Sequence, residues 1–212
     1  HLKNVKPAVM TVGGWYDAED LFGALNTYEA IETQNPPTVR NYLVMGPWSH
    51  SQWAAGKAGN MGNIYFGIDA NERFHKLELE FFNHYLKNEG NPDIAEATIF
   101  VTGSNEWKEY GTWPPKNTVE KRLYFHPREK ASFSAPEAGS SFDEYVSDPM
   151  NPVPYMEDVH LGRPAKYMND DQRFASRRPD VMVYQTDVLT EDITLTGPLT
   201  ADLFVSTTGT DA

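Results

Sequence analysis

The 212-residue sequence contains no cysteine, which excludes disulfide bonds and thiolate chemistry and fits the cytoplasm, periplasm and exterior equally well. Its apolar runs are short, and none approaches the roughly 20 residues of a membrane-spanning helix. Cations are scarce as well, because 18 Lys and Arg residues stand against 30 Asp and Glu residues, giving a net charge of −12. An acidic chain repels phosphate backbones, so nucleic acid is not expected as a partner. The short apolar runs likewise predict no association with a membrane.

The ends of the sequence lack familiar signals. The first residues, 1–7, contain neither an initiating Met nor a signal peptide. The last residues, 207–212, directly follow a strand-like run at 200–206. We therefore expect this chain to be a fragment of a longer protein.

The most informative segments are Gly14–Asp20 and Gly46–His50, where apolar runs end in titratable side chains. The runs at 9–15 and 42–48 predict strands, and the periodicity of 18–34 predicts a helix between them. Asp17 and His50 then follow the carboxyl ends of two strands, which is where sites form in parallel sheets. An Asp before a His is also the order of the last two triad members in α/β-hydrolases. Such pairs also occur by chance, so a purely structural role stays open.

Glu19 and Asp20 join Asp17 in an acidic cluster at the start of the predicted helix. The helix macrodipole favours negative charge there, so helix capping is one interpretation of the cluster. Trp15, Tyr16 and Trp48 either line a substrate pocket or pack at the edge of the sheet.

The sequence changes character near residue 118. Before it, a second helix is predicted over 71–88 and a further strand over 97–102. After it, no long helical pattern occurs, and short strands are predicted at 121–126, 130–134, 180–186, 193–196 and 200–206. We therefore predict two domains, an α/β domain at 1–118 and an all-β sandwich at 119–212.

A nucleophile is missing from this pattern. No serine stands in the Gly-x-Ser-x-Gly frame of a nucleophile elbow; Ser104 and Ser140 each lack the second glycine. The elbow precedes the triad Asp in α/β-hydrolases, so we expect it upstream of His1. His126 and His160 lie apart with no cysteine nearby, so no metal site is predicted.

The segments around Asp17 and His50 resemble those of the α-amino-acid ester hydrolases. The wider family includes cocaine esterase, glutaryl-7-aminocephalosporanic acid acylase and X-Pro dipeptidyl-peptidase. The resemblance extends over nearly the whole chain, through Glu80–Lys87, Tyr145–Pro149, Asp171–Arg173, Arg178–Val181 and Gly197–Leu199. It implies the C-terminal part of an α/β-hydrolase domain, followed by a partial jelly-roll β-sandwich.

By this resemblance Asp17 is the triad acid, His50 is the general base, and Glu19 and Asp20 bind the α-ammonium of a substrate. The family's catalytic Ser, oxyanion-hole Tyr, third acidic residue and cap domain are absent from the chain. The resemblance implies no cofactor. It slightly favours a periplasmic or secreted location, and a homo-oligomer stays open.

The expected activity is that of a serine hydrolase. It would cleave the ester or amide bond of a small molecule, such as an α-amino acyl ester or a β-lactam side chain, through an acyl-enzyme. A glutaryl-7-aminocephalosporanic acid acylase and an X-Pro dipeptidyl-peptidase are alternatives within the family. An alternative of another class is a carbohydrate- or surface-binding jelly roll attached to an inert hydrolase remnant.

Overall fold

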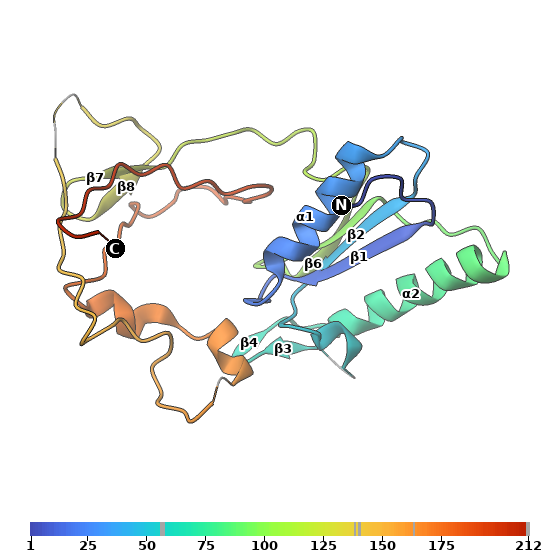
Figure 1. Cartoon of the computed structure of the whole chain (residues 1–212), viewed down its shortest axis with the longest axis horizontal. Helices are drawn as coiled ribbons and strands as arrows, with labels where there is room; N and C mark the ends of the chain where they lie inside the picture. The colour runs from blue at the N-terminus through green and yellow to red at the C-terminus, as the bar shows by residue number, and fades with distance from the viewer. Residues whose placement is uncertain (56–57, 138, 140, 163, 211–212) are drawn as a thin grey trace. The chain divides into compact units, whose positions relative to one another are not determined.

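The computed structural model describes residues 1–55, 58–137, 139, 141–162 and 164–210. The chain divides into two compact units (Figure 1). The first comprises His1–Lys116 with Pro164–Asn169, and the second comprises Asn117–Arg163 with Asp170–Ala212. The domain boundary at 118 stays a prediction.

A four-stranded sheet forms the centre of the first unit. Its order is β1 (Val9–Gly14), β2 (Asn41–Gly46), β5 (Ala97–Val101) and β6 (Glu106–Tyr110). The first three strands are parallel and β6 is antiparallel to β5, so β1 and β6 are the two edges. The predicted strand–helix–strand unit is thereby confirmed.

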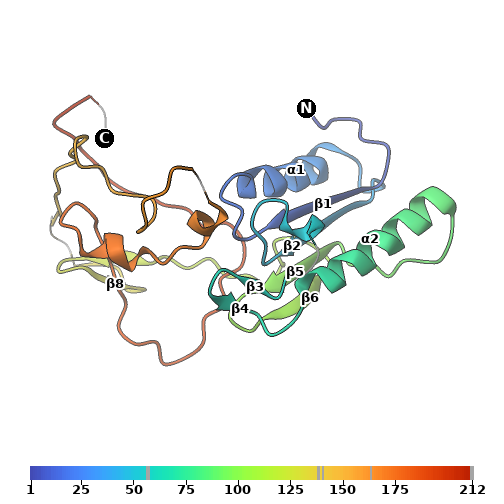
Figure 2. The same cartoon turned by 90° about the horizontal axis from the view of Figure 1, so that it is seen from below.

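Two helices cover opposite faces of this sheet, α1 (Leu21–Gln34) and α2 (Ala70–Lys87). Successive residues of a strand face opposite sides. Leu43 therefore packs in the cluster that contains α1 residues, and Val44 packs in the one that contains α2 residues. Figures 1 and 2 show the two helices on either side of the sheet. Burial on both faces explains why β2 is apolar almost throughout.

Short elements connect β2 to α2. They are the 3₁₀ turn η1 (Gln52–Ala54) and the two-residue strands β3 (Asn60–Met61) and β4 (Ile64–Tyr65), which pair with each other. A second 3₁₀ turn, η2 (Ala165–Met168), belongs to the first unit, where the Asn169 amide donates a hydrogen bond to the Met61 carbonyl at 2.7 Å.

The second unit contains little regular structure in its described residues. Strands β7 (Tyr124–His126) and β8 (Lys130–Ser132) pair antiparallel, within two of the predicted strand segments, and η3 (Gln172–Arg177) is a 3₁₀ helix.

The strands predicted at 180–186, 193–196 and 200–206 are not observed, apart from one bridge between Gln185 and Lys130. A strand needs a neighbour for its main-chain hydrogen bonds, and residues 193–206 have none among the described residues. The jelly roll therefore stays a prediction.

Candidate active site

The ends of β1 and β2 are held together beyond the last paired residues of the two strands. The Tyr16 N–H donates to the Trp48 carbonyl at 3.0 Å. Trp48 is fully buried. Asp17 directly follows Tyr16, and His50 lies two residues after Trp48, so the shared register of the strands brings both side chains to the same edge of the sheet.

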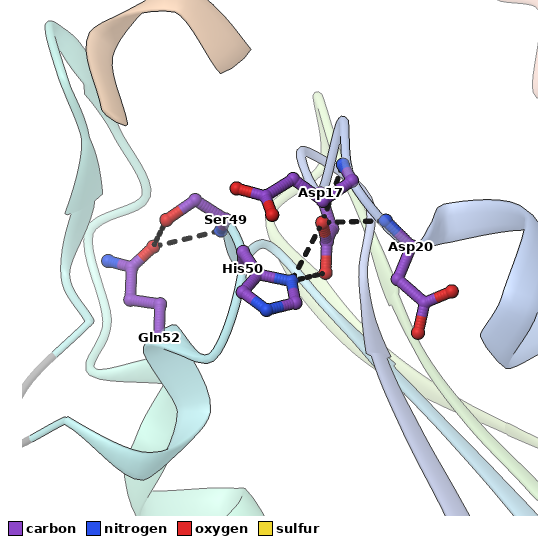
Figure 3. Close-up of polar contacts among 6 residues, drawn as sticks. Asp17, Asp20, Ser49, His50 and Gln52 are labelled. Carbon is purple, nitrogen blue, oxygen red and sulfur yellow. Dashed lines mark hydrogen bonds and ion pairs between the residues drawn. The ribbon is translucent and has the colours of Figure 1, made fainter. Parts of the chain in front are cut away.

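Asp17 and His50 are in direct contact (Figure 3). The Nδ1 atom of His50 lies 3.0 Å from Oδ2 and 3.3 Å from Oδ1 of Asp17. Oδ1 also accepts the main-chain N–H groups of Glu19 at 2.9 Å and Asp20 at 3.0 Å. An ionised carboxylate only accepts hydrogen bonds, so Nδ1 of His50 must donate and therefore carries the proton of the neutral ring. Nε2 then has a free lone pair.

The two partners differ sharply in exposure. The Asp17 side chain is 2% exposed, whereas the His50 side chain is 44% exposed. Nε2 points away from Asp17 in Figure 3. A fixed carboxylate behind a half-exposed imidazole can orient the ring and stabilise its protonated form, while Nε2 remains accessible as a base.

Glu19 and Asp20 lie in the exposed turn that precedes α1. Asp20 is the N-cap residue of α1, but its side chain makes no capping hydrogen bond. Its carboxylate points away from Asp17 (Figure 3) and lies over Gly23, where a Cβ atom would overlap it. The N–H groups of this turn are accepted by Asp17 and not by Asp20. Because residues 18–20 form this turn, the helix begins at Leu21 and not at residue 18 as predicted.

The three aromatic residues near the site behave differently. Trp48 packs among the rings of Trp53, Phe74 and Trp107, so it belongs to the core. Trp15 is half-buried, and its indole N–H donates to the Phe100 carbonyl at 2.8 Å. Tyr16 is also half-buried, and burial raises the pKa of its hydroxyl.

The sequence analysis did not identify the contact between Ser49 and Gln52, which lie on either side of His50 in the chain. Gln52 Oε1 accepts the N–H of Ser49 at 3.1 Å and its hydroxyl at 3.2 Å. The spacing Ser-x-x-Gln is that of a capping box, in which the Gln side chain reaches back to the Ser N–H. This spacing could have identified the turn from the sequence.

Outside the Asp17–His50 pair, a hollow of about 590 Å³ lies between β1, η1 and α2. Neither Asp17 nor His50 lines this hollow. In the described ranges, no three His, Asp or Glu side chains are grouped to hold a metal ion. None of the helices in those ranges combines the length and apolar character needed to cross a membrane.

Two family models match this chain. Residues 84–212 match the X-Pro dipeptidyl-peptidase C-terminal non-catalytic domain, and residues 1–52 match the X-Pro dipeptidyl-peptidase (S15 family). The first match begins within α2, so it includes β5 and β6 of the central sheet.

Similar proteins agree with these matches. Cocaine esterase of Rhodococcus sp. (strain MB1 Bresler) is 30% identical over 97% of this chain and 36% of its own length. A solved α-amino acid ester hydrolase is 35% identical, with a TM-score of 0.83 over 91% of this chain and 33% of its own. An aminopeptidase from a marine sediment archaeon, Thaumarchaeota archaeon, is 33% identical, with a TM-score of 0.82 over 88% and 32%.

The chain thus spans about a third of the length of these relatives. Their shared sequence and fold extend across nearly all of its residues, including the segment that carries Asp17 and His50. The chain therefore belongs to the family of serine hydrolases that includes X-Pro dipeptidyl-peptidase, cocaine esterase and α-amino acid ester hydrolase.

Proposed function

We propose that the whole protein is a serine hydrolase in which Asp17 is the triad acid and His50 is the general base. The observation that carries the proposal is the 3.0 Å contact between Asp17 Oδ2 and His50 Nδ1 at the ends of adjacent parallel strands. The nucleophilic serine would come from a part of the protein outside these 212 residues. Under this proposal the chain supplies the end of an α/β-hydrolase domain, followed near residue 118 by part of a jelly roll.

In this mechanism Nε2 of His50 removes the proton of the serine hydroxyl as its oxygen attacks the carbonyl carbon. The imidazolium then gives that proton to the leaving alcohol or amine as the acyl bond breaks, which leaves an acyl-enzyme. Nε2 next removes a proton from water as the water oxygen attacks the acyl carbon. The imidazolium then returns this proton to the serine oxygen as the acyl–serine bond breaks and the acid leaves. Asp17 keeps the ring in the required tautomer and stabilises its positive charge in both steps.

The favoured substrate is an α-amino acyl ester or amide. Glu19 and Asp20 would bind the α-ammonium group through charge-assisted hydrogen bonds. Their exposed position, one turn from Asp17, and the missing side-chain cap of α1 support this role. The names of two solved relatives, an aminopeptidase and an α-amino acid ester hydrolase, agree with an amino substrate. A dipeptidyl-peptidase is the second candidate, because both matching family models carry that name.

The test is His50→Ala in the full-length protein, assayed with a p-nitrophenyl ester. We expect kcat to fall by roughly 10⁴-fold or more, because the nucleophile loses its base. His75→Ala on α2 is the matched control, since this half-exposed histidine lies outside the site. Near-parental kcat in a folded His50→Ala variant would contradict the proposal.

A further inference from the structure

We propose that Gln52 is a positioning residue that fixes the direction of the His50 imidazole, an inference that rests on the proposed role of His50. Gln52 closes the turn that carries His50. Its main-chain N–H donates to the Ser49 carbonyl at 3.1 Å. Its side-chain Oε1 accepts both the N–H and the hydroxyl of Ser49 (Figure 3). Three hydrogen bonds thus join the first and last residues of a four-residue turn whose second residue is His50.

This turn needs such a closure because its main chain is strained. Ser51 has a φ of 60°, in the left-handed region that residues other than glycine rarely adopt. A conformation of this kind persists only when its surroundings impose it. The hydrogen bonds between Gln52 and Ser49 close the turn on both sides of Ser51. They therefore hold Ser51 in its left-handed conformation.

The position of the His50 Nε2 atom depends on the main-chain conformation of the turn 49–52. Half of the His50 side chain is exposed, and its hydrogen-bond partner in the site is the Asp17 carboxylate. Because both contacts with Asp17 are made at Nδ1, the ring can tilt about this atom unless the main chain is fixed. A misplacement of about 1 Å at a reacting atom can cost about 10²-fold in rate.

Gln52 also ties the turn to the rest of the first unit. The Asn71 amide, fully buried at the start of α2, donates to the carbonyls of Gln52 at 3.2 Å and Ala55 at 2.5 Å. Asp69 accepts the Asn71 N–H at 3.1 Å, which fixes this end of the helix. The Gln52 Nε2 group donates to the Asn60 carbonyl on β3 at 3.4 Å. The turn is therefore anchored to α2 and to the β3–β4 hairpin.

The experiment compares four variants of the full-length enzyme with an α-amino ester. Gln52→Ala removes all side-chain bonds, and we expect kcat to fall about 10-fold with KM within about twofold. Ser49→Ala removes only the hydroxyl bond and should give a smaller loss. Gln52→Glu keeps an oxygen that accepts the Ser49 bonds, so kcat at alkaline pH should return to the parental value. The added negative charge favours protonated His50, so the acidic limb of the pH profile of kcat should lie at higher pH than in the parent. Gln34→Ala, exposed at the end of α1, is the control.

A spectroscopic readout separates positioning from loss of stability. With ¹⁵N-labelled histidine, the Nδ1 proton signal of His50 should weaken or move in Gln52→Ala and stay unchanged in Gln34→Ala. Parental kcat and an unchanged Nδ1 signal in Gln52→Ala would overturn the inference. If Gln52→Ala does not fold, the same two results in Ser49→Ala overturn it, and a graded loss with rescue by Gln52→Glu supports it.

His50→Ala, measured in parallel, distinguishes the two proposals. If His50→Ala is inactive and Gln52→Ala is parental, only the positioning inference fails. If His50→Ala is active, the general-base proposal fails, and the positioning inference fails with it.

Discussion

Gly14 lies directly against the main chain of Trp48. A Cβ atom on Gly14 would overlap the Trp48 carbonyl oxygen, the same oxygen that accepts the Tyr16 N–H. Gly46 is constrained by the same residue, because a Cβ there would overlap the Trp48 ring. Gly14 thus allows the two strand ends to approach, while Gly46 leaves room for the Trp48 ring. The approach of the strand ends sets the distance between the two catalytic candidates.

Gly14→Ala is expected to lower the free energy of unfolding by about 1–3 kcal/mol, because a backbone oxygen cannot move aside as a flexible side chain can. Gly111→Ala is the matched control, since a Cβ at Gly111 meets no atom within 4 Å. Urea unfolding of both variants measures the difference. Equal stability of the two would show that the strand ends are not packed as described.

Glu19→Gln combined with Asp20→Asn is expected to lower kcat/KM for phenylglycine methyl ester by about 10²-fold or more. Each charge-assisted hydrogen bond contributes roughly 1.5–3 kcal/mol, and about 1.4 kcal/mol is a factor of ten. Phenylacetic methyl ester lacks the amine and should be hydrolysed nearly as before. Glu29→Gln with Glu89→Gln removes the same charge from exposed positions elsewhere and serves as the control.

The measured quantity is the ratio of kcat/KM for the two esters in the full-length enzyme. If helix capping were the only role of the acidic pair, both esters would slow alike. An unchanged ratio would reject the ammonium site and favour the esterase or glutaryl-acylase alternatives.

Alkaline pH should destabilise the fold through Tyr42. Burial, then the hydrogen bond with Tyr85 at 2.8 Å, raises the pKa of Tyr42 to about 12. A pKa raised in the folded state gives stability that is complete below the unfolded value of about 10 and is lost between about pH 10 and 12. Tyr42→Phe should therefore show a shallower decline in unfolding free energy between pH 9 and pH 11, as measured by urea unfolding.

Two comparisons complete that measurement. Tyr65→Phe, whose ring is largely exposed, should decline like the parent. Some decline should remain in Tyr42→Phe, because burial and the hydrogen bond to Glu96 also raise the pKa of Tyr28. If the unfolding free energy declined with pH equally steeply in Tyr42→Phe and in the parent, the raised pKa of Tyr42 would be contradicted.

The 212-residue chain by itself should have no hydrolase activity, because none of its serines stands in a nucleophile-elbow frame. The purified chain should neither hydrolyse p-nitrophenyl esters nor react with a fluorophosphonate probe. The full-length protein, labelled in parallel, should react at one serine outside this chain. Labelling of any serine within the chain would contradict the expectation.

The sequence predicted the elements whose residues are buried on regular faces. The apolar runs before Asp17 and His50 indicated β1 and β2, and the order of these residues predicted their meeting. Strand β6 escaped prediction because Glu106, Lys108 and Glu109 interrupt any apolar pattern. It forms because the edge of β5 supplies hydrogen-bond partners along its length.

Other parts could not be predicted because they depend on tertiary context. The start of α1 is set by the Asp17 side chain, which serves the turn and His50 at once. The residues at 200–206 have strong strand propensity, yet Phe204 and Val205 are exposed and no strand lies beside them in the described part of the chain. Propensity alone does not make a strand, because the main-chain hydrogen bonds require a neighbour.

The edge position of β1 bears on how this polypeptide will behave in the laboratory. Within the described sheet β1 pairs only with β2, so half of its N–H and C=O groups face outward beside an apolar hollow. An open edge of this kind is a template onto which another chain can add. Production of the 212 residues alone should therefore be accompanied by concentration-dependent self-association.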